Sequence, residues 1–345
     1  MEQNLIFTND VTAAIKQLEN NGSHNLTVWI ADTNTARLVT PASPHLITIP
    51  AGETDKTLET VTRVWDEMER MGMTRHSMVI NLGGGTVTDL GGFAAATFKR
   101  GVRFINVPTT LLGAVDAAVG GKTGFNYHGL KNEIGAFAAA SDVIISTRFF
   151  NTLPGVEMKS GFAEVLKHAM LSDRSEFLRL LNHSFSAPID HDGLLERLRH
   201  SVQVKADIVA RDPKEQGERK ALNLGHTIGH ALESLAMQRV KPVPHGYAIA
   251  WGLVTEAVLS HIKLRFPSED VHRLGHFVRD NYRGFPFTCD DYDELLLLMR
   301  HDKKSRDGEI TCTLLTAIGD YRIDQTIPPD DVTAALDILR DLLGS

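Results

Sequence analysis

Two histidines stand four residues apart in the stretch NLGHTIGHALE. In a helix, this spacing places the rings of His226 and His230 on one face, one turn apart. Such a pair is a known way to hold zinc, and metalloproteases add a glutamate base directly after the first histidine. Thr227 occupies that position, so the pattern indicates a metal site but does not match the metalloprotease motif.

A catalytic zinc ion usually has three protein ligands and one open position, so further ligands are needed. His245 begins another predicted helix, in PVPHGYAIAWG, where it lies at a cap and not on an apolar stripe. Glu164 lies in the apolar helix SGFAEVLKHAML, where burial of an unpaired carboxylate would cost free energy. The residues alone leave open whether His226, His230, His245 and Glu164 bind a metal or form structural hydrogen bonds.

A glycine turn in INLGGGTVTDLGGFAA is a second candidate site. Between a strand and a helix, such a turn lets the backbone approach a diphosphate at the helix N-terminus. The form is not GxGxxG, because Thr88 replaces the third glycine, and no acidic residue follows at the usual offset. Asp32, with Asn34 nearby, ends an earlier strand and could bind the ribose instead, whereas the alternative is a turn without a ligand. Thr109 and Thr110 follow a further strand and favour the nucleotide interpretation.

Several cations stand out in a chain whose net charge is −7. VDAAVGGKTGFNYHGLKN places Lys122 and Lys131 among glycines, which suits a loop around an anion, although a solvated loop is the plainer interpretation. Lys205 stands in an otherwise apolar stretch, so it either lies along a buried face or points into a site. HDKKSRDG, with Lys303 and Lys304, also fits a charged surface turn.

The composition limits the class of protein. A length of 345 residues suggests about two domains, and 42% hydrophobic residues suffice for sizeable cores. The negative net charge argues against general binding of nucleic acid or anionic membranes. Cys289 and Cys312 lie outside any CxxC motif, and we see neither a signal peptide nor an apolar stretch of membrane-spanning length. We therefore expect a cytoplasmic protein.

The order of predicted elements divides the chain. Up to about residue 150, apolar strands such as LTVWIAD, HLITIP and DVIIS alternate with helical patterns, including one over residues 55–72. Long helical patterns follow, one of them over residues 217–237, and EITCTLLTAIGDYRIDQTI predicts a small hairpin. We expect an α/β Rossmann-like N-terminal domain, residues 1–150, and a mainly α-helical C-terminal domain, residues 151–345.

Six ordered blocks together resemble the 3-dehydroquinate synthases of the sugar-phosphate cyclase superfamily, over about residues 26–320. The blocks are GGGTVTDLGGFAAATFKRG, VPTTLLGAVDAAVGGKTGFN, KNEIGAF, SGFAEVLKHA, LNLGHTIGHALE and HGYAIAWG. The resemblance implies a dehydroquinate synthase-like fold and a homodimeric enzyme that uses NAD+ and a metal ion. The ion would be Zn2+, with Co2+ as the alternative. One departure is Tyr247, where many members carry glutamate.

The reaction implied by the resemblance is a carbon–oxygen lyase step of the shikimate pathway, in aromatic amino acid biosynthesis. The substrate is a small sugar-acid phosphate, 3-deoxy-D-arabino-heptulosonate 7-phosphate. Transient oxidation at C5 by NAD+ would allow phosphate elimination, and re-reduction and an intramolecular aldol step would give 3-dehydroquinate. NAD+ is regenerated in each turnover.

The resemblance also assigns residues to three roles. The metal ligands would be Glu164, His226 and His245, and His230 would lie on the substrate side. Residues implied to meet the nicotinamide nucleotide are Asp32, Asn34, Glu53, Lys56, Gly84, Gly85, Asp89, Thr109, Thr110, Leu112, Lys131, Phe149, Thr152, Leu153 and Glu157. Residues implied to meet the substrate are Asp116, Lys122, Asn132, Lys167, Lys205, Arg219, Asn223, His230, one of Lys303 and Lys304, and Arg100, which the family lends across the dimer interface.

Three other functions are weighed against this one. A related cyclase would act on a sugar phosphate without a carboxylate, and Lys205, Arg219 and Asn223 argue against it as an acid-binding set. A metal-dependent polyol dehydrogenase would accumulate NADH and needs fewer lysines. The full set of candidate ligands and cations argues against a non-catalytic metal-binding or scaffold protein, which an absence of any turnover with Zn2+ and NAD+ would favour.

Overall fold

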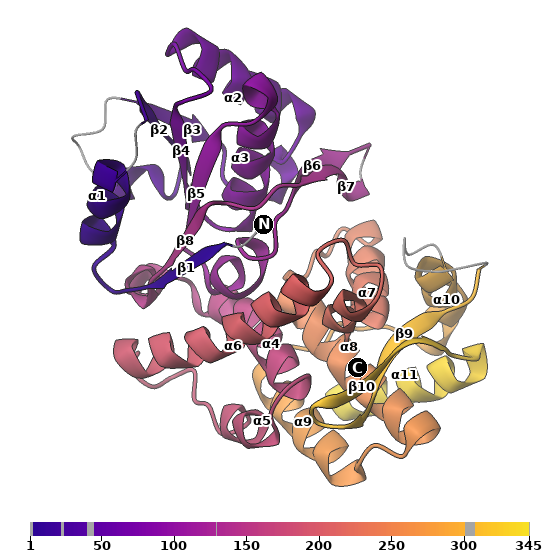
Figure 1. Cartoon of the computed structure of the whole chain (residues 1–345). Helices are drawn as coiled ribbons and strands as arrows, with labels where there is room; N and C mark the ends of the chain where they lie inside the picture. The colour runs from indigo at the N-terminus through magenta and orange to yellow at the C-terminus, as the bar shows by residue number, and fades with distance from the viewer. Residues whose placement is uncertain (1–2, 22–23, 40–44, 129, 301–307, 345) are drawn as a thin grey trace. The chain divides into compact units, whose positions relative to one another are not determined.

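The computed structural model describes residues 3–21, 24–39, 45–128, 130–300 and 308–344. The course of the chain is drawn in Figure 1. Among these residues, no helix combines the length and the apolar character that crossing a bilayer requires.

The chain divides into two compact units, each described by itself. The first, which we call the sheet unit, comprises Met1–Pro154 and Pro188–Ala206. The second, which we call the helical unit, comprises Gly155–Ala187 and Asp207–Ser345. The chain therefore returns to the sheet unit for a short segment after first leaving it.

A six-stranded parallel sheet forms the centre of the sheet unit, with the strand order β1-β8-β5-β4-β2-β3. Its strands are β1 (Asn4–Phe7), β2 (Thr27–Asp32), β3 (Leu46–Ile49), β4 (Met78–Gly83), β5 (Arg103–Pro108) and β8 (Asp142–Ile145). The predicted strands LTVWIAD, HLITIP and DVIIS are confirmed as β2, β3 and β8. The central strands read as continuous apolar runs because helices cover both faces of the sheet.

Helices pack on both faces of this sheet (Figure 1). On one face lies α1 (Val11–Asn21), whose Ile15 joins Trp29, Ile80 and Ile105 in the core. On the other lie α2 (Leu58–Arg70) and α3 (Gly85–Thr97), and α2 confirms the helix predicted over residues 55–72. This layering explains why the strands between them carry so few polar side chains.

The chain order of the strands creates a switch point. From β2 the chain crosses to β3 on one side and later to β4, β5 and β8 on the other. The carboxyl ends of the neighbouring strands β2 and β4 therefore lie side by side at this switch point, which is where open α/β sheets bind their ligands. Asp32 ends β2 and Gly83 ends β4, so two of the candidate segments meet here.

Residues 122–137 form an antiparallel hairpin of β6 (Lys122–Tyr127) and β7 (Leu130–Phe137), with His128 described in the turn. The interpretation of this segment as a glycine-rich loop is wrong. Glycines are needed here because the two strands approach closely: a Cβ on Gly124 would lie 2.5 Å from the carbonyl oxygen of Ile134. The lysines of the stretch thus stand on a hairpin whose strands fix their positions.

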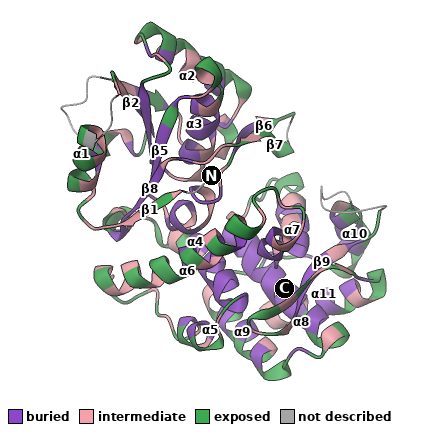
Figure 2. Cartoon of the chain, in the orientation of Figure 1, coloured by how far each residue is buried: buried purple, intermediate pink, exposed green. Residues whose placement is uncertain are grey.

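The helical unit is built around α8 (His245–Leu264), which is buried from Gly246 to Ser260. Figure 2 shows this helix buried along most of its length. The unit also contains α4 (Gly155–Met170), α5 (Arg174–Leu180), α7 (His226–Gln238), α9 (Ser268–Asn281), α10 (Tyr292–Arg300), α11 (Pro329–Leu343) and the hairpin of β9 (Thr311–Ala317) and β10 (Asp320–Thr326). The predicted hairpin is thereby confirmed. Helix α6 (His191–Arg211) contributes to both units.

The predicted continuous helix over residues 217–237 is wrong in its first half. A 3-10 turn covers Glu218–Asn223, and Gly225 adopts the left-handed conformation with φ +79° immediately before α7 begins. A Cβ on Gly225 would also lie 2.8 Å from the Leu253 side chain. The break makes His226 the first residue of α7, so its position is set by the turn as well as by the helix.

Candidate metal and nucleotide sites

The candidate metal ligands come together at the junction of three helices in the helical unit. Glu164 Oε1, on α4, lies 3.6 Å from His226 Nε2 on α7 and 3.7 Å from His245 Nε2 on α8. The carboxylate is completely buried, and His226 is 9% exposed. The ligand nitrogens of His226, His230 and His245 all lie within 4.8 Å of one another.

Glycines let these helices approach closely enough to form the cluster. A Cβ on Gly246 would lie 1.9 Å from the Ser160 carbonyl oxygen, so only glycine allows α8 to start against α4. The Gly246 N–H also donates to Ser160 Oγ at 3.0 Å. On the α7 side, a Cβ on Gly252 would lie 1.9 Å from the carbonyl oxygen of Gly225. The close contacts therefore place His245 beside Glu164, and His226 beside α8.

The two histidine rings that face Glu164 are each oriented through their second nitrogen. Nδ1 of His226 lies 3.1 Å from the carbonyl oxygen of Leu224, and Nδ1 of His245 lies 3.3 Å from Glu233 Oε2. Both acceptors require a proton on Nδ1, which leaves Nε2 free to bind a metal. Glu233 was missed by the sequence analysis, although its position seven residues after His226 and three after His230 puts it on the same helix face.

In the absence of a metal, the carboxylates around His245 favour the protonated form of its ring. Burial lowers the pKa of the ring, but hydrogen bonds to the Glu164 and Glu233 carboxylates outweigh this effect and raise it to about 10. A metal ion must therefore displace a proton from this ring when it binds.

The cluster fits a divalent metal ion of the zinc type. Tetrahedral bonds of 2.0–2.2 Å place ligand atoms about 3.3 Å apart, close to the separations between Glu164 and the two imidazoles. One carboxylate and two or three imidazoles are also the donors that such ions prefer. The other oxygen of Glu164 contacts the ammonium group of Lys167, which is buried one turn along α4.

The candidate nucleotide site lies at the switch point of the sheet unit. Gly84 and Gly85 begin α3, and a Cβ on Gly84 would lie 3.0 Å from the Thr110 side chain. The Thr109 N–H donates to the carbonyl oxygen of Gly83 at 2.9 Å, which ties β5 to the turn. Asp32 Oδ1 accepts two backbone N–H groups at 2.8 Å each, from Asn34 and from the residue after it. The glycine turn, both threonines and Asp32 are thus gathered at one sheet edge.

A polar network surrounds the N-terminal half of α3. Lys56 Nζ lies 2.7 Å from Asp89 Oδ2, 2.5 Å from Asn132 Oδ1 and 3.9 Å from Glu53 Oε1. Burial lowers the pKa of Lys56, but the Asp89 and Glu53 carboxylates outweigh it and raise the pKa above its ordinary value. Asn126, which the sequence analysis missed, donates to Glu53 Oε1 at 2.9 Å. Asn132, predicted to meet the substrate, therefore lies among the predicted nucleotide residues.

Other predicted substrate residues have partners within their own unit. In the sheet unit, Lys205 Nζ donates to the side chain of Asp116 at 2.5 Å and to its backbone carbonyl at 2.6 Å. In the helical unit, the buried Arg219 donates to the carbonyl of Pro213 at 2.7 Å, and Asn223 donates to Glu215 Oε1 at 2.8 Å. Each of these three side chains therefore donates to an acceptor of its own unit.

The remaining predicted residues are placed as follows. Phe149 packs against the apolar core of the sheet unit, and Lys122 and Lys131 are exposed on the β6–β7 hairpin. Also in the sheet unit are Leu112, Arg100, Thr152 and Leu153, whereas Glu157 lies in the first turn of α4. Lys303 and Lys304 lie outside the described residues.

Two family models match consecutive parts of the chain. The 3-dehydroquinate synthase N-terminal model covers residues 46–160, and the 3-dehydroquinate synthase C-terminal model covers residues 161–305. The 3-dehydroquinate synthase of Parabacteroides distasonis is 39% identical over 351 residues, with 99% of each chain covered. That of Acinetobacter baylyi is 41% identical over 292 residues, covering 84% of this chain and 79% of its own.

Solved structures of sugar-phosphate cyclases share the fold. A 2-epi-5-epi-valiolone synthase from Streptomyces hygroscopicus, with NAD+ and Zn2+ bound, has a TM-score of 0.86 and 26% identity, covering 99% of this chain and 97% of its own. A 2-deoxy-scyllo-inosose synthase, complexed with carbaglucose-6-phosphate, NAD+ and Co2+, has a TM-score of 0.84 at 23% identity, covering 98% and 96%. Together, the family models and the relatives show that this chain belongs to the 3-dehydroquinate synthase family.

Proposed function

We propose that the chain converts 3-deoxy-D-arabino-heptulosonate 7-phosphate to 3-dehydroquinate and phosphate, as an NAD-dependent and metal-dependent phosphate-eliminating cyclase. The observation that carries this proposal is the buried carboxylate of Glu164, which faces the Nε2 atoms of His226 and His245 from two other helices. This donor set suits an ion that acts on a hydroxyl group. The membership of the chain in the 3-dehydroquinate synthase family supports the choice of reaction.

We assign the metal to Glu164, His226 and His245, with Zn2+ as the native ion and Co2+ as a replacement. A bound divalent ion would lower the pKa of a coordinated hydroxyl group of the substrate. His230, one helical turn beyond His226, is left to donate to or accept from the substrate beside the ion. Lys167 contacts the other oxygen of Glu164 and so orients the carboxylate.

We assign NAD+ to the switch point of the sheet unit. The N–H groups at the start of α3, after Gly84, would receive the diphosphate, and Asp32 would receive a ribose hydroxyl. Lys56, whose ammonium group lies 2.7 Å from Asp89 Oδ2, would contribute a cation to the nucleotide site. NAD+ supplies a hydride acceptor that is restored within each turnover.

The cations and amides that the resemblance implies would bind the anionic groups of the substrate. Arg219 and Lys205 suit the carboxylate, because a guanidinium fork can donate to two carboxylate oxygens at once. Lys122, Asn132, Asn223 and His230 would serve the phosphate. By holding both ends, these side chains would select one substrate conformer, which converts binding into correct alignment of the reacting carbons.

We further propose the division of labour between domains that the sequence suggests. Residues 1–150 would bind the nucleotide, and residues 151–345 would bind the metal and most of the substrate. Lys205 belongs by its contacts to the sheet unit and would also bind the substrate. We propose a cytoplasmic location, because neither Cys289 nor Cys312 stands in a CxxC motif.

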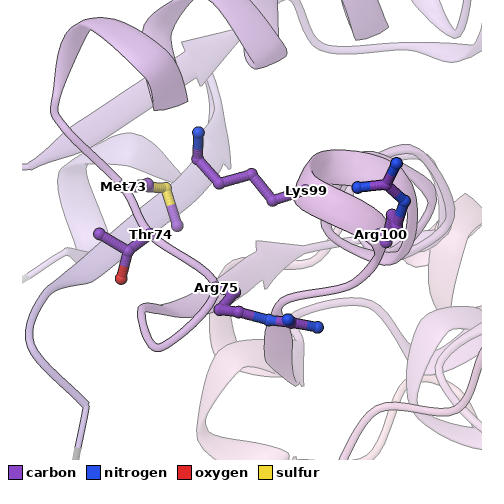
Figure 3. A pocket seen from close by; sticks show the side chains of 5 residues that line it. All are labelled: Met73, Thr74, Arg75, Lys99 and Arg100. Atoms are coloured by element: carbon purple, nitrogen blue, oxygen red, sulfur yellow. The ribbon is translucent and has the colours of Figure 1, made fainter.

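A homodimer would let Arg100 act on a partner subunit. Helix α3 runs 13 residues, or about 20 Å, from the glycine turn to Thr97, so Arg100 lies far from that turn. Lys99, Arg100 and Gly101 have φ values of +48°, +68° and +115°, and this unusual backbone sets the direction of the two cations. Lys99 and Arg100, together with Arg75, line a surface cavity of about 440 Å³ (Figure 3). We propose that Arg100 reaches the phosphate site of a partner subunit.

Turnover assays test the proposed function. Mixing the protein with the heptulosonate phosphate, NAD+ and Zn2+ should release phosphate without any accumulation of NADH. Accumulating NADH would instead indicate a polyol dehydrogenase. Faster turnover of sedoheptulose 7-phosphate or glucose 6-phosphate would indicate a different cyclase, because these sugars lack the carboxylate.

A further inference from the structure

Glu233 stands on the same face of α7 as His226 and His230, one turn beyond the second histidine. Its side chain is buried, with 5% exposure, and its Oε2 lies 3.3 Å from Nδ1 of His245 on α8. The contact joins the carboxylate of one helix to the first residue of another. It therefore acts on a proposed metal ligand from outside the set of residues assigned to the metal.

A histidine that binds a metal through Nε2 needs an acceptor for the proton on Nδ1, because that partner fixes the tautomer and the ring plane. His226 obtains this acceptor from the backbone, at the carbonyl oxygen of Leu224. His245 obtains it from a side chain, Glu233. The Nδ1 atoms of the two rings thus have different kinds of acceptor, a backbone carbonyl for His226 and a side-chain carboxylate for His245.

The charge of Glu233 has a second consequence. A carboxylate that accepts the Nδ1 proton makes Nε2 a better electron donor than a backbone carbonyl does. The ring of His245 lies between two carboxylates, since its Nε2 faces Glu164 Oε1 at 3.7 Å. The geometry is that of a carboxylate–histidine–metal triad, with Glu233 as the outer carboxylate.

We propose that Glu233 is a positioning residue for the metal: it holds His245 with a proton on Nδ1 and Nε2 directed at the ion. The proposal rests on the proposed metal site and adds to it a residue that sets metal affinity without touching the metal. Substitution of Glu233 should therefore weaken metal binding by about 10- to 100-fold.

The test compares Zn2+ dissociation constants, measured by competition with a chelator, in the full-length protein and three variants. Glu233→Ala should bind Zn2+ about 100-fold more weakly, and Glu233→Gln about tenfold, because the amide oxygen still accepts the proton but carries no charge. Glu176→Gln is the matched control, since Glu176 is also buried with 5% exposure in the helical unit but pairs with Arg179. It should bind Zn2+ as the wild type does.

The Co2+ absorption spectrum provides a readout that a purely structural role would not change. Glu233→Gln should shift its visible bands, whereas Glu176→Gln should not. Wild-type affinity and an unchanged spectrum in both Glu233 variants would overturn the proposal. Failure of the wild type to bind Zn2+ or Co2+ would instead refute the proposed metal site itself.

A measurement on the wild type decides the question if the Glu233 variants do not fold. Nitrogen-15 NMR of the zinc-loaded protein, with labelled histidine and the His245 signals assigned from a His245→Asn variant, should show a protonated Nδ1 and a metal-bound Nε2. A metal-bound Nδ1 on His245 would overturn the proposal.

Discussion

Gly246→Ala should move His245 away from Glu164 without substituting any of the metal ligands. The added Cβ would lie 1.9 Å from the carbonyl oxygen of Ser160, and 2.5 Å from its carbonyl carbon and Cα. Close carbon–oxygen contacts in proteins are about 3.3 Å, so the start of α8 must move away from α4 by about 1.4 Å. These are backbone atoms within helices, which cannot turn aside as a flexible side chain would.

The displacement acts directly on His245, the residue before Gly246. Its Nε2 now lies 3.7 Å from Glu164 Oε1, and a retreat of about 1.4 Å would exceed the tolerance of about 0.2 Å in metal–ligand distances. We expect Zn2+ affinity and turnover to fall at least 100-fold. Overpacking should also lower the free energy of unfolding by about 1–3 kcal/mol.

The assays are chelator competition for Zn2+, phosphate release and thermal unfolding. Gly155→Ala, at the start of α4, is the matched control, because a Cβ there meets nothing within 4 Å. That control should keep its metal and its activity. Wild-type metal affinity in Gly246→Ala would refute the argument that this close contact positions His245.

Four further predictions concern charged side chains of the proposed sites. Arg219→Ala should raise KM for the heptulosonate phosphate more than tenfold, and an unchanged KM would show that the carboxylate is bound elsewhere. Because the pKa of His245 is raised from 6.5 to about 10 without metal, Zn2+ affinity should rise about tenfold per pH unit between pH 7 and 9. The same shift stabilises the metal-free fold fully below pH 6.5, so its Tm should fall as the pH rises toward 10; a flat affinity and a flat Tm would contradict both statements. Arg100→Ala and Glu164→Ala should each be inactive, but mixed subunits should recover about a quarter of wild-type activity, since a heterodimer contains one intact site. No recovery after subunit exchange would argue against a shared site.

The alternation of strands and helices allowed the sheet unit to be predicted, because a sheet covered on both faces needs continuous apolar strands. From the sequence, the glycine turn and Asp32 could be assigned to one nucleotide site only by assuming an unusual order, because Asp32 ends a strand that precedes the turn. The structure explains that order, since β2 and β4 are neighbours on either side of the switch point. The division of function between residues 1–150 and 151–345 stays a prediction.

Contacts that depend on tertiary packing could not be predicted in this way. The hairpin at residues 122–137 was interpreted as a loop, because its glycines signal a turn in sequence but serve a close pairing of strands. The helix predicted over residues 217–237 breaks at Gly225, whose left-handed backbone depends on the neighbouring α8. Helical spacing alone indicated the pair of His226 and His230, whereas Glu164 and His245 join them only through the contacts between helices.

Anomalous diffraction at the zinc edge, from crystals grown with NAD+ and Zn2+, tests the central claim most directly. The account predicts a single strong peak at 2.0–2.2 Å from a carboxylate oxygen of Glu164, from His226 Nε2 and from His245 Nε2, with the nicotinamide ring of the bound NAD+ near the ion. A zinc ion that is bound by other residues, or that lies far from the nicotinamide ring, would contradict it.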